Sequence, residues 1–379
     1  MPHFVAHKEI AGAMLYYAYM TLLTALGHLA LVILTGISGM LHDGVRFTER
    51  IDSFNSSLTS PIAREVSNIS DFLAAFDDIV TSRLRTDVRY QQAATFESTG
   101  ISSSSAPAAV SDALVNIYCS TRIHDRLLTT SGSGAFIDDQ GIILTNAHVA
   151  QFLLLAESAT SSKSTCVIRE GSPATHKYEA ALLYMSPTWV VQNATQLHDE
   201  HPMGTGERDF ALLYVTQALD GSIPSTFPSL TIAPESYPFE LAPVSAAGYP
   251  AYVQENDPYL SLSQLIATTS ISRLYTFTDG HVDVIAITPS AVGEQGSSGG
   301  PILDFDDTVI GLITTRGNVD TEGAQSLHAL TLPYISRVLR SETGLSLTET
   351  LSGDIALRAQ IFRETLIPPL RTYLEAETR

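Results

Sequence analysis

The chain has 379 residues, which is enough for more than one small domain. Its 40 acidic residues outnumber its 21 lysines and arginines, giving a net charge of −19 at pH 7. A surface that binds nucleic acid needs clustered positive charge to neutralise phosphates, so this balance excludes nucleic acid as the expected partner. The acidity otherwise favours solubility and says nothing about the fold.

Residues 10–41 contain no Asp, Glu, Lys or Arg. A helix that crosses a bilayer needs roughly 20 apolar residues, so we predict a transmembrane segment here, after a tail at 1–9. A secretory signal peptide is the alternative, although its apolar region usually has about 7–15 residues. Lys8 precedes the run and Arg46 and Arg50 follow it, so the positive-inside rule leaves the orientation open.

Residues 42–107 are predicted to form a helical stalk and a serine-rich linker. Apolar residues recur every three to four positions across 62–80, and Pro61 suits the first turn of a helix. Four consecutive serines at 102–105 then indicate a flexible connection. The helical part is expected to pack on the following domain, to act as a spacer or to support an oligomer, and these alternatives stay open.

Residues 131–149 read as two short strands joined by a tight turn at 139–141. The second strand ends just before His148, where a rigid scaffold can aim an imidazole. Farther along, Asp209 stands immediately before an apolar run, 210–215, that is typical of a buried strand. His148 and Asp209 are therefore candidates for a general base and the acid that orients it.

A serine lies within a run of glycines at 296–301. Glycines allow backbone conformations with positive φ and bring amide N–H groups close to a reacting carbonyl. Ser298 is thus a candidate nucleophile, but a serine is weakly nucleophilic at neutral pH and needs a base and an orienting group. His148 and Asp209 supply both.

The run 198–201, His-Asp-Glu-His, contains four potential metal ligands. Consecutive residues do not all face one ion, and Pro202, Gly204 and Gly206 indicate a loop. We therefore expect no metal and no cofactor.

The sequences TNAHV (145–149), DFALL (209–213) and GSSGGP (296–301), in that order, resemble the trypsin-like serine proteases of the chymotrypsin clan. The likeness is closest to the HtrA-type branch and covers about 113–340. It implies a mainly β domain at 108–342, built of two six-stranded antiparallel barrels and flanked by helices. The implied activity is serine endopeptidase cleavage of protein or peptide substrates through an acyl-enzyme.

The resemblance also implies roles for individual residues. Ser298 would attack the carbonyl, His148 would take and return the proton, and Asp209 would hold the imidazole tautomer. Backbone N–H groups of Gly296 and Ser298 would bind the oxyanion.

The substrate pocket is a further implication of the resemblance. Val292 occupies the position at which trypsins carry an acid, so a small or apolar P1 residue is expected. Glu294 is close enough in sequence that its carboxylate is an alternative pocket group, and Gln295 adjoins it. Thr314 and Thr315 would line one wall of the cleft.

The two cysteines, Cys119 and Cys166, both fall in the first half of the protease region. We expect one disulfide, because an exported domain with an even cysteine count favours it, with free buried thiols as an equally open alternative. Residues 343–379 are expected to form a helical tail, interrupted at Pro368 and Pro369 and too short for the PDZ domain that usually follows HtrA proteases.

These expectations describe a single-pass membrane protein whose protease domain lies, by the resemblance, on the extracytoplasmic side. The alternative function is a catalytically silent barrel protein that binds peptides or organises a membrane assembly.

Overall fold

The computed structural model describes residues 108–377 apart from 124–125, 157–162, 196–205, 251–261, 278–279, 289, 291, 294 and 320–324. The predicted tail (1–9), transmembrane segment (10–41) and stalk with linker (42–107) lie outside the described residues, as does the run 198–201. Among the helices that are described, none has the length and apolar character needed to cross a membrane.

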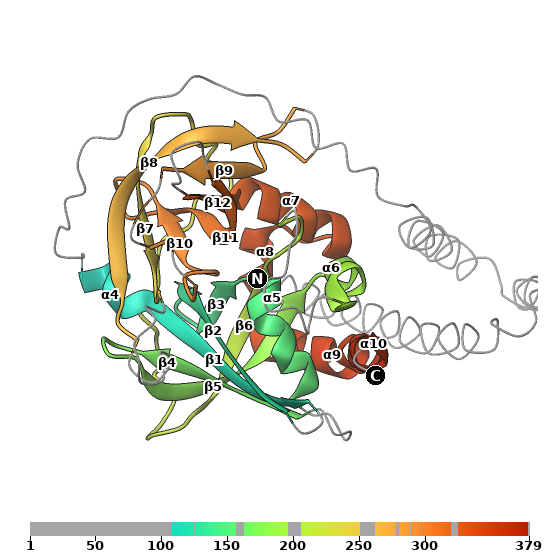
Figure 1. The fold of residues 1–379 in the computed structure, drawn as a ribbon. Helices are drawn as coiled ribbons and strands as arrows, with labels where there is room; N and C mark the ends of the chain where they lie inside the picture. The colour runs from blue at the N-terminus through green and yellow to red at the C-terminus, as the bar shows by residue number, and fades with distance from the viewer. Residues whose placement is uncertain are drawn as a thin grey trace, which may run out of the picture. The chain divides into compact units, whose positions relative to one another are not determined.

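Six antiparallel strands close the first barrel in the order β1-β2-β3-β6-β5-β4 (Figure 1). Strand β3 is buried throughout, and it follows a turn in which Gly141 adopts a φ of 87° and its N–H donates to the Asp138 carbonyl at 3.2 Å. The hairpin predicted at 139–141 is therefore confirmed. The strands span β1 Leu114–Ile123, β2 Arg126–Asp138, β3 Ile142–Thr145, β4 Lys163–Glu170, β5 Thr175–Met185 and β6 Ala211–Ala218.

A second closed barrel of six antiparallel strands has the order β10-β11-β12-β9-β8-β7. Its own apolar core is separate from a larger core that fills the first barrel and continues into the contact with the second barrel and the C-terminal helices. The predicted pair of six-stranded barrels is thus confirmed. The strands span β7 Pro243–Gly248, β8 Leu265–Tyr275, β9 Val284–Ile287, β10 Pro301–Leu303, β11 Val309–Val319 and β12 Gln325–Thr331.

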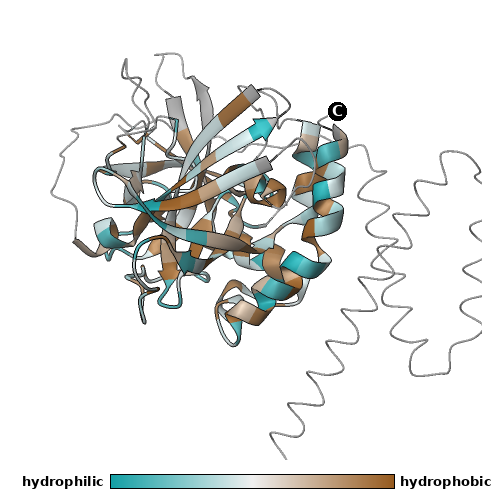
Figure 2. Cartoon of the chain, turned by 90° about the horizontal axis from the view of Figure 1, so that it is seen from below, coloured by the Kyte–Doolittle hydropathy of each residue, from teal (hydrophilic) through white to brown (hydrophobic). Residues whose placement is uncertain are grey.

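Helices follow the second barrel and return the chain to the first. Helix α9 packs on β5 and α10 packs on α6, so the end of the chain contacts the barrel formed by its beginning. In Figure 2 these helices carry both brown and teal segments, as expected for helices that bury one face. The helices span α4 Ala108–Ala113, α5 Ala147–Ala150, η1 Gln151–Leu155, α6 Pro187–Asn193, α7 Leu332–Thr343, α8 Leu347–Thr350, α9 Ile355–Thr365 and α10 Ile367–Glu377.

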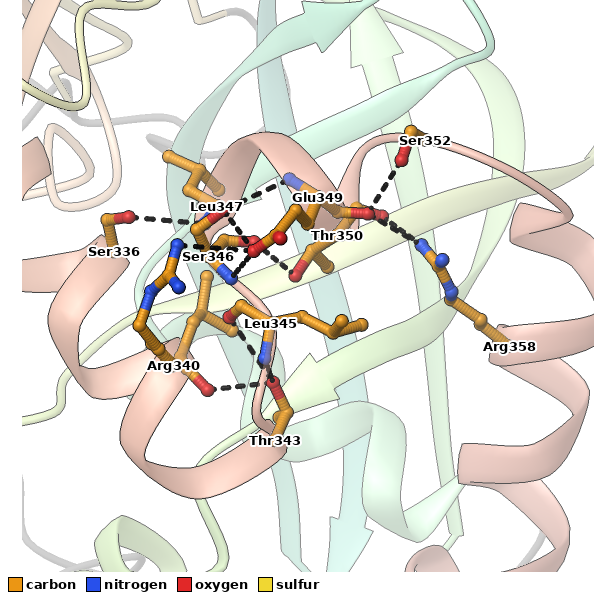
Figure 3. Close-up of polar contacts among 11 residues, drawn as sticks. Ser336, Arg340, Thr343, Leu345, Ser346, Leu347, Glu349, Thr350, Ser352 and Arg358 are labelled. Atoms are coloured by element: carbon orange, nitrogen blue, oxygen red, sulfur yellow. Dashed lines mark hydrogen bonds and ion pairs between the residues drawn. The ribbon is translucent and has the colours of Figure 1, made fainter. Parts of the chain in front are cut away.

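The junction between α7 and α8 is held by a capping box (Figure 3). The Glu349 N–H donates to the Ser346 hydroxyl at 3.3 Å, and the Ser346 N–H donates to the Glu349 carboxylate at 2.8 Å. Arg340 of α7 donates to the same carboxylate at 3.2 Å. Two N–H groups that a helix start leaves unpaired are thereby satisfied, which fixes the turn after α7.

Cys119 on β1 lies directly opposite Cys166 on β4, with their Cα atoms 4.1 Å apart, and the two are joined in a disulfide. The structure therefore has the bridge rather than the pair of free thiols. The bridge closes a loop with a sequence separation of 47 that contains β2, β3 and His148.

Candidate functional site

His148 lies on the short helix α5, directly after the buried strand β3. Its ring Nδ1 lies 2.7 Å from Oδ2 of Asp209, and its backbone N–H donates to Oδ1 of the same carboxylate at 2.9 Å. The His148 side chain is 30% exposed and the Asp209 side chain 6%, so the pair is buried on the acid side and reachable on the imidazole side. A carboxylate at Nδ1 favours the tautomer whose Nε2 accepts a proton.

Asp209 precedes β6, as the sequence predicts, and its carboxylate has a third donor. The Thr314 hydroxyl, on β11 of the second barrel and 3% exposed, donates to Oδ2 at 2.7 Å. The backbone carbonyl of Asp209 accepts a hydrogen bond from the Asn146 side-chain amide at 2.7 Å. Both barrels therefore orient this one acid.

The pKa values of the pair shift in opposite directions. Burial lowers the pKa of His148, but the charge of Asp209 and its hydrogen bond outweigh burial, so the pKa lies above its ordinary 6.5. Burial raises the pKa of Asp209, whereas the charge and hydrogen bonds of His148 and the Thr314 hydroxyl lower it, and the net pKa is below its ordinary value. Asp209 is thus an anion that favours a positive imidazole beside it.

The loop before Asp209 is fixed by helix α7. Arg208 has a φ of 57°, which is uncommon for a residue with a side chain. Its N–H donates to the Tyr334 hydroxyl at 3.0 Å, and its Nε donates to Glu342 at 3.1 Å. Glu342 also accepts hydrogen bonds from Tyr184 at 2.7 Å and from Ser186 at 2.9 Å. Asp209 therefore follows a residue in an uncommon backbone conformation, and that residue is held by Tyr334 and Glu342 of α7.

Ser298 lies in the loop that leads into β10 of the second barrel, and it is partly exposed, whereas Ser297 is 1% exposed. Three successive carbonyls of this loop are hydrogen-bonded. The Ser133 hydroxyl donates to the Gly296 carbonyl at 2.7 Å, and the Ser133 N–H donates to the Ser298 carbonyl at 2.7 Å. The Ser297 carbonyl accepts from the Gly300 N–H at 2.9 Å.

The two glycines after Ser298 allow the loop to approach neighbouring backbone. A Cβ on Gly299, whose φ is 87°, would lie 2.1 Å from the Ser133 carbonyl oxygen and 2.5 Å from the Thr145 hydroxyl. A Cβ on Gly300 would lie 2.0 Å from the Ala247 carbonyl oxygen. Only residues without a side chain fit at these two positions.

The residue after Ser298 contacts the segments that carry His148 and the Asp209 partner Thr314. Gly299 adjoins Thr145, three residues before His148, and its N–H donates to the carbonyl of Ile313, which precedes Thr314, at 2.9 Å. Between the described residues, no hydrogen bond joins the Ser298 hydroxyl to the His148 imidazole. Such bonds are often long without substrate and shorten when the reacting complex forms.

The predicted pocket residues differ in exposure. Val292 is fully buried in the core of the second barrel, and Gln295 is exposed. Glu294 lies outside the described residues, and Thr315 lies on β11. Thr314 is buried, and its hydroxyl donates to Asp209. In the part of the chain that the structure describes, no cluster of His, Cys and acidic side chains is arranged to hold a metal.

Sequence reasoning missed two residues of this site, Ser133 and Asn146, and the hydrogen bond from Thr314 to Asp209. Ser133 and Asn146 stood within runs already considered, 131–149, but nothing in the pattern indicated their partners. All three bind groups at least 63 positions away in sequence, apart from the Ser133 carbonyl contact with Thr145.

Comparison with known proteins bears on the same region. Residues 132–312 match the family profile of the trypsin-like peptidase domain. No curated protein matches the chain significantly. Among solved structures, the chain is similar to an inactive mutant form of Rv3671c from M. tuberculosis H37Rv, at 21% sequence identity and a TM-score of 0.39, over 62% of this chain and 88% of that one.

Proposed function

Since this chain contains a trypsin-like peptidase domain of the serine type, we propose that it is an endopeptidase whose nucleophile is Ser298, with His148 as base and Asp209 as its orienting acid. The observation that carries the proposal is the contact of Asp209 with both the ring and the backbone N–H of His148. Such a contact fixes the direction of the imidazole and the tautomer that accepts a proton.

The reaction follows from these contacts. Ser298 Oγ forms a bond to the scissile carbonyl carbon while Nε2 of His148 takes its proton, and the carbonyl oxygen becomes an oxyanion. The N–H groups of Gly296 and Ser298 stabilise that oxyanion. The C–N bond then breaks as His148 returns the proton to the leaving amine. Water, deprotonated by His148, releases the acyl group from Ser298 by the reverse sequence.

The proposed electrostatics suit this proton transfer. The ionised Asp209 raises the pKa of His148, which stabilises the imidazolium formed when Ser298 loses its proton. The Thr314 hydroxyl helps keep Asp209 ionised, because a donated hydrogen bond favours the carboxylate.

The proposed substrates are proteins or peptides with a small or apolar P1 residue. The apolar Val292 occupies the position predicted for the pocket base, and its burial leaves no charge there for a basic side chain. A cleavage profile on a peptide library tests this preference, and dominant cleavage after Arg or Lys would contradict it.

We further propose that the enzyme is anchored in a membrane through residues 10–41, with the peptidase domain on the extracytoplasmic side. The charge-free sequence of that segment supports the anchor, and the Cys119–Cys166 disulfide supports an oxidising compartment. If the full chain leaves membranes during alkaline carbonate extraction, the anchor is wrong.

Covalent labelling with a fluorophosphonate probe tests the nucleophile. The full chain is expected to be labelled, and Ser298→Ala is expected to lose labelling and casein cleavage together. Ser229→Ala, which alters an exposed serine between β6 and β7, is the matched control and is expected to react like the unaltered chain. Absence of labelling in the folded, unaltered chain would instead favour a silent peptide-binding barrel.

A further inference from the structure

Ser133 uses all of its polar groups at the contact between the two barrels. It lies on β2, is fully buried, and donates through its N–H to the Ser298 carbonyl and through its hydroxyl to the Gly296 carbonyl, both at 2.7 Å. The same hydroxyl accepts a hydrogen bond from the Tyr249 N–H, just after β7, at 2.8 Å. Its carbonyl accepts from the Thr145 hydroxyl at 2.8 Å.

These contacts determine which way the neighbouring N–H groups point. In a trans peptide unit the C=O of one residue and the N–H of the next point in opposite directions. The Ser297 carbonyl is held by Gly300, so the Ser298 N–H points away from that contact. The Gly296 carbonyl is held by the Ser133 hydroxyl, so the peptide plane between the two proposed oxyanion donors has a fixed orientation.

Gly296 makes this anchor necessary. Its φ is 93°, and a glycine has no side chain to restrict rotation of its peptide planes. A rotation there would turn its N–H away from the oxyanion position. The Ser133 hydroxyl holds the next peptide plane, which carries the Gly296 carbonyl and the Ser297 N–H, so the plane with the Gly296 N–H is joined to a neighbour of fixed orientation. The hydroxyl is itself held in place by the Tyr249 N–H.

We infer that the Ser133 hydroxyl is a positioning group for the oxyanion-binding N–H groups of Gly296 and Ser298, supplied by the first barrel to the nucleophile loop of the second. The inference rests on the proposed function of the site. The Ser133 hydroxyl acts through the Gly296 carbonyl and not on the reacting atoms, whereas the Ser133 N–H, which donates to the Ser298 carbonyl, is kept in Ser133→Ala. Removal of the hydroxyl therefore weakens binding of the transition state more than binding of the substrate.

The test compares Ser133→Ala with Thr121→Val in the full chain. Thr121 is a matched control because its hydroxyl is also buried, and it is hydrogen-bonded to Ser164 at 2.8 Å between β1 and β4. Ser133→Ala loses two buried hydrogen bonds of its hydroxyl and Thr121→Val loses one, so both variants are expected to unfold at lower temperature. Only Ser133→Ala is expected to lower kcat, by about 10- to 100-fold with little change in KM, since misdirecting a donor costs less than the 10²–10³ of removing one.

A peptide boronic acid gives a second measurement. It bonds to the nucleophilic oxygen and places a boron-bound oxygen where the oxyanion forms, so its inhibition constant should rise with Ser133→Ala by about the same factor as kcat falls. Thr121→Val should leave both values unchanged. Equal kcat and boronate affinity in the two variants would overturn the inference.

The outcomes separate this inference from the proposed function. If Ser298→Ala is inactive while Ser133→Ala keeps full kcat, the positioning role fails and the nucleophile stands. If Ser298→Ala remains active, the proposed function itself fails. Should Ser133→Ala not fold, Ser133→Cys decides on the same measurements, because a thiol is a weaker donor of nearly the same shape and a fully retained kcat and boronate affinity would exclude the role.

Discussion

The two oxygens of the Asp209 carboxylate bind two different groups of His148: Oδ1 accepts the backbone N–H and Oδ2 contacts ring Nδ1. One acid therefore sets both the position of the residue and the direction of its ring. The arrangement leaves the imidazole with one orientation relative to its own backbone. This is the geometry that a base requires in order to meet a nucleophile from another part of the chain.

Asp209→Asn is expected to lower kcat by about 10⁴-fold with a much smaller change in KM. An amide group at this position can donate to Nδ1, and it then favours the tautomer whose Nε2 already carries a proton. Steady-state kinetics on a peptide substrate check this, with Asp220→Asn as a control because Asp220 is exposed and separate from the site. A loss below about tenfold would contradict the assignment of Asp209.

On the acid side, kcat/KM should fall with a midpoint above pH 6.5. Only neutral His148 accepts a proton, and Asp209 raises the pKa of His148 above that value. Activity is lost as pH falls through the raised pKa. In Asp209→Asn the anion is gone, so the midpoint of the remaining activity should move to lower pH. An unchanged midpoint in that variant would mean that another group titrates.

Glu342→Gln should lower kcat several-fold and the free energy of unfolding by about 1–3 kcal/mol. Glutamine keeps the size, but it has one acceptor oxygen where Glu342 uses one for Tyr184 and the other for Ser186, and it loses the charge that holds Arg208 beside Asp209. Glu364→Gln is the control, since Glu364 is exposed on α9. Denaturant unfolding and kinetics on both variants measure the effect, and equal values for the two would exclude a role for Glu342.

Arg208→Gly should be more stable than Arg208→Ala by about 1 kcal/mol, the reverse of the usual order. Both variants lose the contact with Glu342, so their difference reports the cost of a side chain at a φ of 57°. The comparison uses urea unfolding monitored by circular dichroism. A more stable alanine variant would show that the positive φ is not kept in solution.

Replacing Cys119 and Cys166 together by alanine should lower the free energy of unfolding by about 2–4 kcal/mol while leaving kcat nearly unchanged. The bridge joins β1 to β4, and it constrains the unfolded chain without touching the His148–Asp209 pair. Non-reducing mass analysis after alkylation verifies the bridge in the unaltered chain. Labelling of both cysteines without prior reduction would refute it.

Local patterns predicted the elements that carry the chemistry. The turn at 139–141, the strand after Asp209 and the glycine-rich loop around Ser298 each depend on a few adjacent residues, and the structure has all of them. The cysteine pairing was left open by the sequence, because only the register of β1 with β4 brings Cys119 opposite Cys166.

Contacts between distant segments were beyond such patterns. Arg208 and Glu342 are separated by 134 positions, and an arginine gives no sign that its φ is positive. The buried hydroxyl of Thr314 likewise reads as an ordinary strand residue until β11 is placed beside Asp209. The membrane segment and the stalk remain predictions, because they lie outside the described residues.

The tight approach of Gly299 and Gly300 to the strands of both barrels has a consequence for mutational surveys. A library that samples every amino acid would find these positions as intolerant as the nucleophile next to them, although neither contributes a reacting atom. Sensitivity to substitution therefore overstates the number of catalytic residues in the loop around Ser298. A residue that is intolerant only because its surroundings are crowded can be told from a catalytic residue by asking whether the folded variant still reacts with an electrophilic probe.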